Sequence, residues 1–328
     1  MVSVGHAPPP SAHGGDGARL AQSLGIPVDD VLDLSASLNP VAPDVRRLLA
    51  RHLESLSRYP DVTDATNALA NAMGVDPGRL VLTNGGAEAI ALVAAELQSG
   101  WIEDPEFSLY RRHLLHVEPN APRWRSNPNN PSGLLAGWDE TAEVWDEAFW
   151  QLATGSWTRG DADNGSIVIG SLTKLLACPG LRIGYVICPS EEVAGKIRSR
   201  QPQWPLNGLA ASGLPELLET IDLRGWARSV AQLRGDLERL LRDTGFDPRP
   251  SDANWLLLEA PGLRDELAQR AILIRDCSSF GMPGVVRIAV PPEGGLERLE
   301  VALAHRRPSG RPTGRPNRCP NRSDGTPA

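Results

Sequence analysis

Short apolar runs alternate with helical periodicities along this chain. Strand-like runs, rich in β-branched residues, occupy residues 81–83, 141–145, 166–170, 181–188, 255–259 and 285–290. Apolar positions with helical spacing occupy residues 43–56, 63–73, 87–97, 190–200, 223–243 and 296–304. Strands that alternate with helices predict an α/β fold with a mainly parallel sheet.

The composition narrows the functional classes. The chain has 328 residues, of which 41% are hydrophobic, and a formal net charge of −7. Nucleic-acid partners call for a basic surface, so none is expected. No apolar run is long enough for a transmembrane helix, and the N-terminus lacks the pattern of a secretory signal, so no membrane association is expected.

Cysteine and histidine spacing indicates a protein without a metal site. The four cysteines and six histidines have no metal-ligand or redox spacing, which favours a reduced, cytoplasmic protein. Residues 306–328 contain mostly Pro, Gly, Arg and Ser, and they cannot bury enough apolar surface to offset their conformational entropy. A disordered tail is predicted there.

The segment that carries most chemistry is residues 171–185, SLTKLLACPGLRIGY. A strand ends at two hydroxyl residues and a lysine, and an arginine follows eight positions after the lysine. Hydroxyls and a guanidinium suit a phosphate ester, and a cation beside the lysine would lower its pKa for Schiff-base chemistry. The pattern alone leaves an ordinary strand–loop–strand with a surface lysine equally open.

This segment resembles the cofactor-lysine motif of the class I/II aminotransferase superfamily, the pyridoxal-phosphate-dependent (PLP) fold type I. The resemblance implies a large domain with a mainly parallel sheet and a smaller α+β domain. It implies that Lys174 carries pyridoxal 5'-phosphate as a Schiff base. Ser171, Thr173 and Arg182 would then hold the cofactor phosphate.

Two further segments follow in the order of that superfamily. Residues 83–88, TNGGAE, stand at a strand-to-helix junction, where free N–H groups attract phosphate. By resemblance, the backbone of Gly85, Gly86 and Ala87 surrounds the phosphate, although a capped Gly-rich turn would look the same. Phe107 matches an aromatic that stacks on the pyridine ring; a core phenylalanine is the alternative.

The next two matches concern the polar groups of the cofactor. Residues 127–133, NPNNPSG, resemble the signature loop whose asparagine, here Asn130, donates to the PLP 3-oxygen. Asp146 matches the aspartate that keeps the pyridine nitrogen protonated, so that the ring acts as an electron sink. Asp139 is a rival in a similar Trp-Asp-Glu sequence, but only Asp146 continues into Ala-Phe.

Two matches concern the partner subunit and the substrate. Tyr59, in the sequence Arg-Tyr-Pro, resembles the tyrosine that reaches the PLP phosphate of the neighbouring subunit, which implies a homodimer with shared sites. Simple packing is the alternative for Tyr59. Arg287 resembles the arginine on a strand that grips the substrate carboxylate.

One branch of the superfamily is matched by several segments. Residues 13–16, 32–40, 203–207 and 274–280 are similar to threonine-phosphate decarboxylase and its cobalamin-pathway relatives, close kin of histidinol-phosphate aminotransferase. The match makes His13, Asn39 and Arg275 candidates for substrate binding, the first and last for a substrate phosphate. Phe149 stands where transaminases usually carry a tyrosine, a change that occurs in the decarboxylase branch.

The resemblance implies a PLP-dependent lyase similar to threonine-phosphate decarboxylase in cobalamin biosynthesis. An aminotransferase similar to the histidinol-phosphate enzyme is the alternative, and a non-catalytic paralogue is the second. The expected organisation is an N-terminal segment, 1–40, packed on the small domain, then a large domain, 41–205, and a small domain, 206–305.

Two stretches are short for the family. Nineteen residues separate Phe107 from Asn127, and twelve separate Gly133 from Asp146. Parallel strands need a crossover connection, and a helix plus a strand does not fit in the second gap. The spacing therefore predicts either a trimmed sheet or a bare loop in place of a helix.

Overall fold

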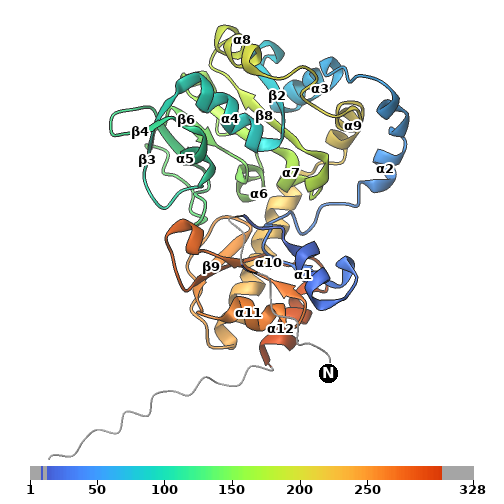
Figure 1. Cartoon of the computed structure of the whole chain (residues 1–328), viewed down its shortest axis with the longest axis vertical. Helices are drawn as coiled ribbons and strands as arrows, with labels where there is room; N and C mark the ends of the chain where they lie inside the picture. The colour runs from blue at the N-terminus through green and yellow to red at the C-terminus, as the bar shows by residue number, and fades with distance from the viewer. Residues whose placement is uncertain (1–8, 10–12, 305–328) are drawn as a thin grey trace, which may run out of the picture.

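The computed structural model describes residue 9 and residues 13–304, which form two lobes (Figure 1). The upper lobe contains a seven-stranded sheet with helices on both faces. The lower lobe contains a three-stranded sheet, and the N-terminal helix lies beside it. The predicted α/β fold class is confirmed, whereas the tail predicted at 306–328 lies outside the described residues.

The large sheet has the strand order β2-β8-β7-β6-β5-β3-β4. Only β8 runs antiparallel to its neighbours in this sheet. The strand bounds are β2 (Leu80–Asn84), β3 (Ser99–Ile102), β4 (His116–Val117), β5 (Arg123–Ser126), β6 (Val144–Asp146), β7 (Ile167–Ser171) and β8 (Ile183–Ile187).

Alternate side chains of these strands enter two separate cores, as the twofold period of a strand requires. Leu80, Leu82 and Val168 face the core covered by α2, α3, α9 and the start of α10. Val81 and Ile169 face the core covered by α4, α5 and α8. Both faces of the sheet are therefore covered, which explains the nearly continuous apolar sequence of β7 and β8.

The helices of this lobe are mostly short. Their bounds are α2 (Arg46–Ala50), α3 (Thr63–Met73), α4 (Gly85–Leu97), α5 (Leu109–His113), α6 (Trp150–Thr154), α7 (Leu172–Leu175), α8 (Glu191–Arg200), α9 (Gly208–Glu219) and α10 (Leu223–Asp243). Helix α10 connects the lobes, since Trp226 and Val230 pack in the large core and Leu237 and Leu241 in the small one. The division of the chain at residue 206 stays a prediction.

The small lobe packs the N-terminal segment against its own sheet. Strand β1 (Leu32–Asp33) pairs in parallel with β10 (Ile272–Leu273). The antiparallel sheet has the order β11-β12-β9, with β11 (Arg275–Asp276), β12 (Val285–Ala289) and β9 (Trp255–Glu259). The remaining helices are α1 (Gly17–Leu24), α11 (Leu263–Ala268) and α12 (Gly295–Ala304).

The link between β5 and β6 is a bare loop, one of the two outcomes that the short spacing predicted. Residues 127–143 contain no helix. The side chain of Arg159 compensates by donating from Nη2 to the carbonyls of Gly137, Trp138 and Glu140, at 3.1, 3.0 and 3.1 Å. At the other end, Trp255 Nε1 donates to the carbonyl of Pro131 at 2.8 Å.

Most of the predicted elements are confirmed within one or two residues, including the helices at 63–73 and 223–243. The helix predicted over 43–56 is instead split into α2 and a 3₁₀ segment, Leu53–Ser57. Helix α9 was not predicted, because Pro215 interrupts its pattern. Among the described helices, none has both the length and the apolar run that a bilayer requires.

Candidate active site

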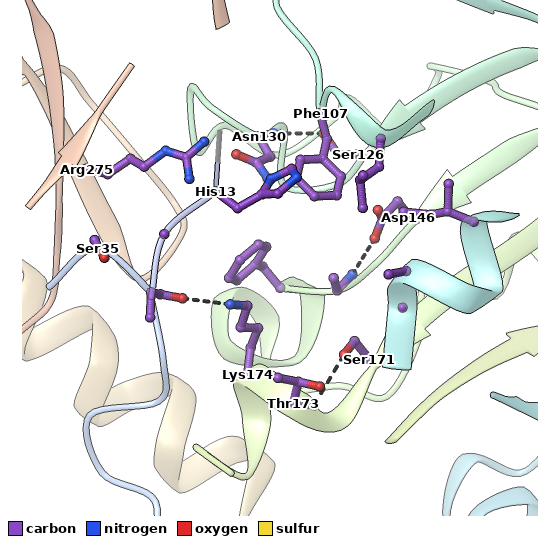
Figure 2. A pocket seen from close by; sticks show the side chains of 18 of the residues that line it. His13, Ser35, Phe107, Ser126, Asn130, Asp146, Ser171, Thr173, Lys174 and Arg275 are labelled. Atoms are coloured by element: carbon purple, nitrogen blue, oxygen red, sulfur yellow. Dashed lines mark hydrogen bonds between the residues drawn. The ribbon is translucent and has the colours of Figure 1, made fainter. Parts of the chain in front are cut away.

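A cavity of about 290 Å³ opens between the two lobes (Figure 2). It is lined from the large lobe by the α4 N-terminus, β6, the β7–α7 turn and the 126–130 segment, and from the small lobe by β11 and β12. The lining includes these sequence-predicted residues: His13, Gly86, Ala87, Phe107, Asn130, Asp146, Ser171, Thr173, Lys174, Arg182, Arg275 and Arg287.

Lys174 lies on α7, directly after the buried strand β7. Its Nζ donates to the carbonyl of Ala36 at 2.7 Å (Figure 2). Burial, together with the positive charges of Arg287 and Arg182, lowers the pKa of this amine to about 8. A larger share of the amine is therefore neutral near pH 7, which is the state that attacks an aldehyde.

Asp146 ends β6 on the opposite side of the cavity. Its Oδ2 accepts a hydrogen bond from the Tyr110 hydroxyl at 2.8 Å, and its Oδ1 accepts one from the amide of Ala148 at 3.0 Å. Burial raises the pKa of this carboxyl, and the two hydrogen bonds oppose that shift. A protonated ring nitrogen facing Asp146 would stabilise the ionised form of its carboxyl, which burial otherwise disfavours.

The turn from β2 into α4 faces the turn from β7 into α7. Gly85 has φ of +75°, and a Cβ there would lie 2.4 Å from Nη2 of Arg182. Only glycine therefore allows the guanidinium to approach the helix N-terminus this closely. Ser171 caps α7 by accepting from the amide of Thr173 at 3.3 Å.

These groups fit a phosphate ester. The buried hydroxyl of Thr173 has no hydrogen-bond partner within the described part of the chain, although its residue lines the cavity. Arg182 is held in a left-handed conformation, φ +58°, beside the free N–H groups of α4. An anion at this place would satisfy the hydroxyl, the guanidinium and the helix N-terminus together.

The third wall combines the bare link with β12. Arg287 donates from Nη1 to Oδ1 of Asn130 at 2.7 Å, and its guanidinium lies 4.7 Å from the ring centroid of Trp255. Burial and the nearby Arg275 lower the pKa of Arg287 to about 9. Its Nε has no partner among the described residues, so the side chain can still receive an anion.

The mouth of the cavity is also basic. His13 and Arg275 face it from the N-terminal segment and from β11 (Figure 2). Arg275 donates to the Ser279 hydroxyl at 3.1 Å. The His13 ring lies 5.7 Å from the Phe107 ring, and burial and the charge of Arg275 lower the pKa of His13.

Three candidates lie elsewhere. Tyr59 is 77% exposed and stacks on Trp204 with ring centroids 4.3 Å apart, outside the cavity. Asn39 lies beneath α7, where its side chain donates to the carbonyl of Leu175 at 2.9 Å. Asp139 is exposed on the bare link and does not line the cavity, in contrast to its rival Asp146.

Sequence reasoning missed several residues of the site. Tyr110 lies three residues after Phe107, and the two rings contact edge to face with centroids 5.8 Å apart, so the spacing could have indicated that Tyr110 packs beside Phe107. Glu106 and Ser126 gave no signal, because their pairing joins two segments twenty residues apart. Ser35 and Ala36 follow β1, and the pairing of β1 with β10 helps to bring this segment to the cavity.

Phe149 lines the cavity beside Lys174. Its ring contacts Trp255 edge to face with centroids 4.6 Å apart, and Nζ of Lys174 lies 5.8 Å from its centroid. The phenyl ring provides no hydroxyl at this position. A cofactor oxygen on this side would therefore meet Asn130 but no phenol.

Comparison with known proteins agrees with this geometry. The family model for aminotransferase class I and II matches residues 126–305. Threonine-phosphate decarboxylase from Salmonella typhimurium is 31% identical over 89% of this chain and 96% of that protein. Histidinol-phosphate aminotransferase 1 from Dechloromonas aromatica is 26% identical over 87% of this chain and 93% of that protein.

A solved structure shows the same fold. Histidinol-phosphate aminotransferase from Sinorhizobium meliloti, in complex with pyridoxal-5'-phosphate, superposes with a TM-score of 0.76 at 18% identity, covering 88% of this chain and 93% of the other. The matched family model spans more than half of the chain. This chain belongs to the aminotransferase class I and II family and is a PLP-dependent enzyme.

Proposed function

We propose that the chain decarboxylates a phosphorylated amino acid, with threonine phosphate as the substrate to test first and cobalamin biosynthesis as its context. The observation that carries this proposal is the pair of arginines, Arg287 and Arg275, that reach one cavity from adjacent strands. Threonine phosphate has one carboxylate and one phosphate, so each guanidinium has an anionic partner. The 31% identical relative supports the same substrate.

The cofactor roles follow from the groups that line the cavity. When bound at Lys174, pyridoxal phosphate supplies an electron sink for the bond broken at Cα. In this proposal Asp146 holds the proton on the ring nitrogen, Phe107 covers the ring and Asn130 donates to the 3-oxygen. The phosphate is held by Gly85, Gly86, Ala87, Ser171, Thr173 and Arg182.

The substrate roles follow from the charges at the two ends of the cavity. Arg287 binds the carboxylate, and His13 and Arg275 bind the phosphate. Asn39 supports the substrate side indirectly, because its amide donates to the carbonyl of Leu175 beneath the lysine turn. Arg287 would hold the carboxylate that leaves as CO2, and Lys174 would give a proton to Cα in its place.

The charge state of Lys174 suits that last step. With a pKa of about 8, the free amine is partly protonated at neutral pH and can both release and return a proton. Phe149 lacks the hydroxyl that a tyrosine here would donate to the cofactor 3-oxygen. That hydrogen bond would favour the neutral form of the cofactor's imine nitrogen. The proposal favours decarboxylation because this arrangement differs from that of typical transaminases.

An aminotransferase acting on histidinol phosphate is the second candidate, favoured by the 26% identical relative. Histidinol phosphate has no carboxylate, so Arg287 would then serve only the second substrate. The test is incubation of purified protein with each compound. Release of CO2 from threonine phosphate supports the lyase, whereas glutamate formed from histidinol phosphate and 2-oxoglutarate contradicts it.

A non-catalytic paralogue is the outcome if the cofactor does not bind. Holoenzyme should be yellow, and borohydride should fix the cofactor on Lys174 in a tryptic peptide. Colourless protein without label would overturn every catalytic proposal made for this chain. The visible spectrum is therefore the first measurement.

The proposal also includes a cytoplasmic homodimer that shares its sites. The stack of Tyr59 on Trp204 supports the homodimer, because it leaves two large aromatic side chains exposed to water, as at a surface that a partner covers. Sedimentation of the holoenzyme should give a dimer. A monomer that retains full activity would contradict a role for Tyr59 in a neighbouring site.

A further inference from the structure

The segment in front of helix α1, residues 13–17, forms a strap at the mouth of the cavity. His13 lines the cavity from this strap, and Ser35 and Ala36 line it from the loop after β1 (Figure 2). The His13 ring lies 5.7 Å from the ring of Phe107 on the large lobe. The contact between strap and loop therefore decides where the His13 ring stands.

One carboxylate joins the strap to this loop. Asp33 lies at the end of β1, and its Oδ1 accepts from the amide of Ser35 at 2.9 Å and from the Ser35 hydroxyl at 2.6 Å. Its Oδ2 accepts from the amide of Gly17 at 3.1 Å. The Ser35 hydroxyl, which gives its proton to Asp33, accepts in turn from the amide of Gly15 at 2.9 Å. None of the roles assigned above uses Asp33.

The bond to Gly17 also satisfies the start of α1. A helix leaves its first N–H groups without internal partners, and Asp16, the residue before Gly17, makes no side-chain cap. Asp33 supplies an acceptor from sixteen positions further along the chain. A carboxylate is favoured at this place because a helix N-terminus carries a partial positive charge. Asp33 therefore fixes the point at which the strap enters the helix.

The glycines of the strap allow this close contact. A Cβ on Gly14 would lie 2.1 Å from the carbonyl oxygen of Ser35, so a larger residue could not approach the loop as closely. Gly15 has φ of +95°, a conformation that favours glycine. The packing at Gly14 and the hydrogen bonds of Asp33 therefore hold the same contact between strap and loop.

The loop that Asp33 holds also meets the lysine, because the carbonyl of Ala36 accepts from Nζ of Lys174. Burial lowers the pKa of Lys174, as do Arg287 and Arg182, and the carboxylate of Asp33 opposes them. A test of Asp33 must therefore separate its effect on the strap from its effect on the lysine.

We infer that Asp33 is a positioning residue for the substrate phosphate, which acts by seating the strap so that the His13 ring stands at the mouth of the cavity with Arg275. This inference rests on the phosphate role proposed for His13. Asp33 does not itself line the cavity, so it reaches the phosphate only through the strap. Its loss should weaken recognition of a phosphorylated substrate more than that of the same substrate without phosphate.

The first test compares threonine phosphate with threonine as substrates of the holoenzyme. In Asp33→Asn an amino group replaces one oxygen, so Ser35 or Gly17 loses its acceptor. The ratio of kcat/KM for the two substrates should fall by about tenfold, mostly through the KM for threonine phosphate. The ratio cancels the effect on Lys174, which acts on both substrates. Asp29→Asn is the matched control and should leave the ratio unchanged, because Asp29 is an exposed carboxylate on the segment that leads into β1.

A double-mutant cycle assigns the effect to His13. In the His13→Ala background, Asp33→Asn should change the ratio by less than about twofold, because the strap no longer carries the group that Asp33 positions. An equal loss in both backgrounds would overturn the inference, and so would equal losses of kcat/KM for the two substrates. If circular dichroism shows that Asp33→Asn does not fold, Gly14→Ala must give the same loss of the ratio, because its Cβ would push the strap off the loop.

A measurement on His13 itself needs no substrate. Burial and the charges of Arg275 and Arg112 lower the pKa of His13 below 6.5. NMR of the histidine ring protons, with His13→Asn to assign the signal, should show a midpoint closer to 6.5 in Asp33→Asn and a native midpoint in Asp29→Asn. Loss of a negative charge alone would instead lower the midpoint. A midpoint that is unchanged or lower in Asp33→Asn would overturn the inference.

These outcomes differ from failure of the proposed reaction. If the holoenzyme releases no CO2 from threonine phosphate, the proposed substrate is contradicted, and the His13 titration still decides whether Asp33 seats the strap. A shifted titration with an unchanged substrate ratio in an active enzyme would overturn the phosphate role of His13, and this inference with it.

Discussion

Two walls of the cavity are held together in different ways. The lysine wall comprises the α4 N-terminus and residues 171–187, and regular strands and helix caps fix it. The link wall comprises residues 105–107 and 126–146, and it has no crossover helix. There, side chains from distant segments replace the missing backbone contacts: Glu106, Arg159 and Trp255.

The contrast has an energetic consequence. In the lysine wall, each functional side chain is carried by backbone that β7, α7 or β8 fixes at one end, so one substitution removes a chemical group and leaves the frame. In the link wall, the single side chain of Arg159 donates to three carbonyls of the loop, so one substitution releases the frame itself.

Replacement of the lysine should remove chemistry without removing structure. For Lys174→Ala we expect turnover to fall by about a thousandfold or more, because the nucleophile and proton carrier are lost. The free energy of unfolding of the apoprotein should change little, since the substitution removes a buried cation. Steady-state assays and urea unfolding measure the two effects.

The matched control is Lys196→Ala, an exposed lysine that pairs with Glu192 on the surface of α8. This variant should change neither turnover nor the free energy of unfolding. A Lys174→Ala variant that keeps a tenth of native turnover would contradict the assignment of this wall.

Replacement of Arg159 should affect the stability of the protein more than its chemistry. Arg159→Gln leaves three carbonyls of the bare link without their donor and removes a guanidinium that lies 4.7 Å from the Trp145 ring centroid. We expect the free energy of unfolding to fall by about 3 kcal/mol, because the Arg159 side chain is almost fully buried and its ion pair with Asp161, at 3.6 Å, is lost. Cofactor affinity should fall as well, by roughly tenfold, because Asn130 lies on the released link.

Arg200→Gln provides the comparison, since Arg200 makes an exposed ion pair with Glu96. Its loss should cost about 0.5 kcal/mol or less in urea unfolding. Equal losses of unfolding free energy in the two arginine variants would show that the stability of the link does not depend on Arg159.

The same contrast explains what sequence could predict. Lys174, its hydroxyl neighbours and Arg182 lie within twelve residues of each other, so one local motif indicated this part of the lysine wall, and a second motif, residues 83–88, indicated the α4 N-terminus. Asn130 and Asp146 also had local motifs, and the missing helix between them followed from counting residues. The roles of Glu106 and Arg159 could not be predicted, because their contacts join segments about twenty residues apart and depend on how the bare link folds.

Glu106 gives the link wall a pH dependence between about pH 4.5 and 7, below the range in which Lys174 titrates in the lysine wall. The folded state raises the pKa of Glu106 from 4.5 to about 7, so it holds the proton more tightly than the unfolded state. This contribution to stability is complete below about pH 4.5 and is lost as the pH rises to about 7; its size is roughly 3 kcal/mol. Glu106→Gln should flatten this part of the stability profile.

The measurement is the free energy of unfolding of the apoprotein from pH 5 to pH 8. The native chain minus the Glu106→Gln variant gives the contribution of this carboxyl, because other groups cancel. A difference that stays constant over this range would contradict a buried, titrating Glu106.

The smallest expected effect is at Phe149, where the two walls meet. Phe149→Tyr adds a hydroxyl in the cavity beside Lys174, within reach of a cofactor oxygen on the Asn130 side. A phenol that donates there stabilises the negative charge on that oxygen and lowers the pH midpoint of the visible absorbance by about one unit, or about 1.4 kcal/mol. The packing against Trp255 should tolerate the extra oxygen, because Phe149 lines the cavity. If the midpoint does not move, the hydroxyl does not reach the cofactor, and the phenylalanine loses its value as an argument for decarboxylation.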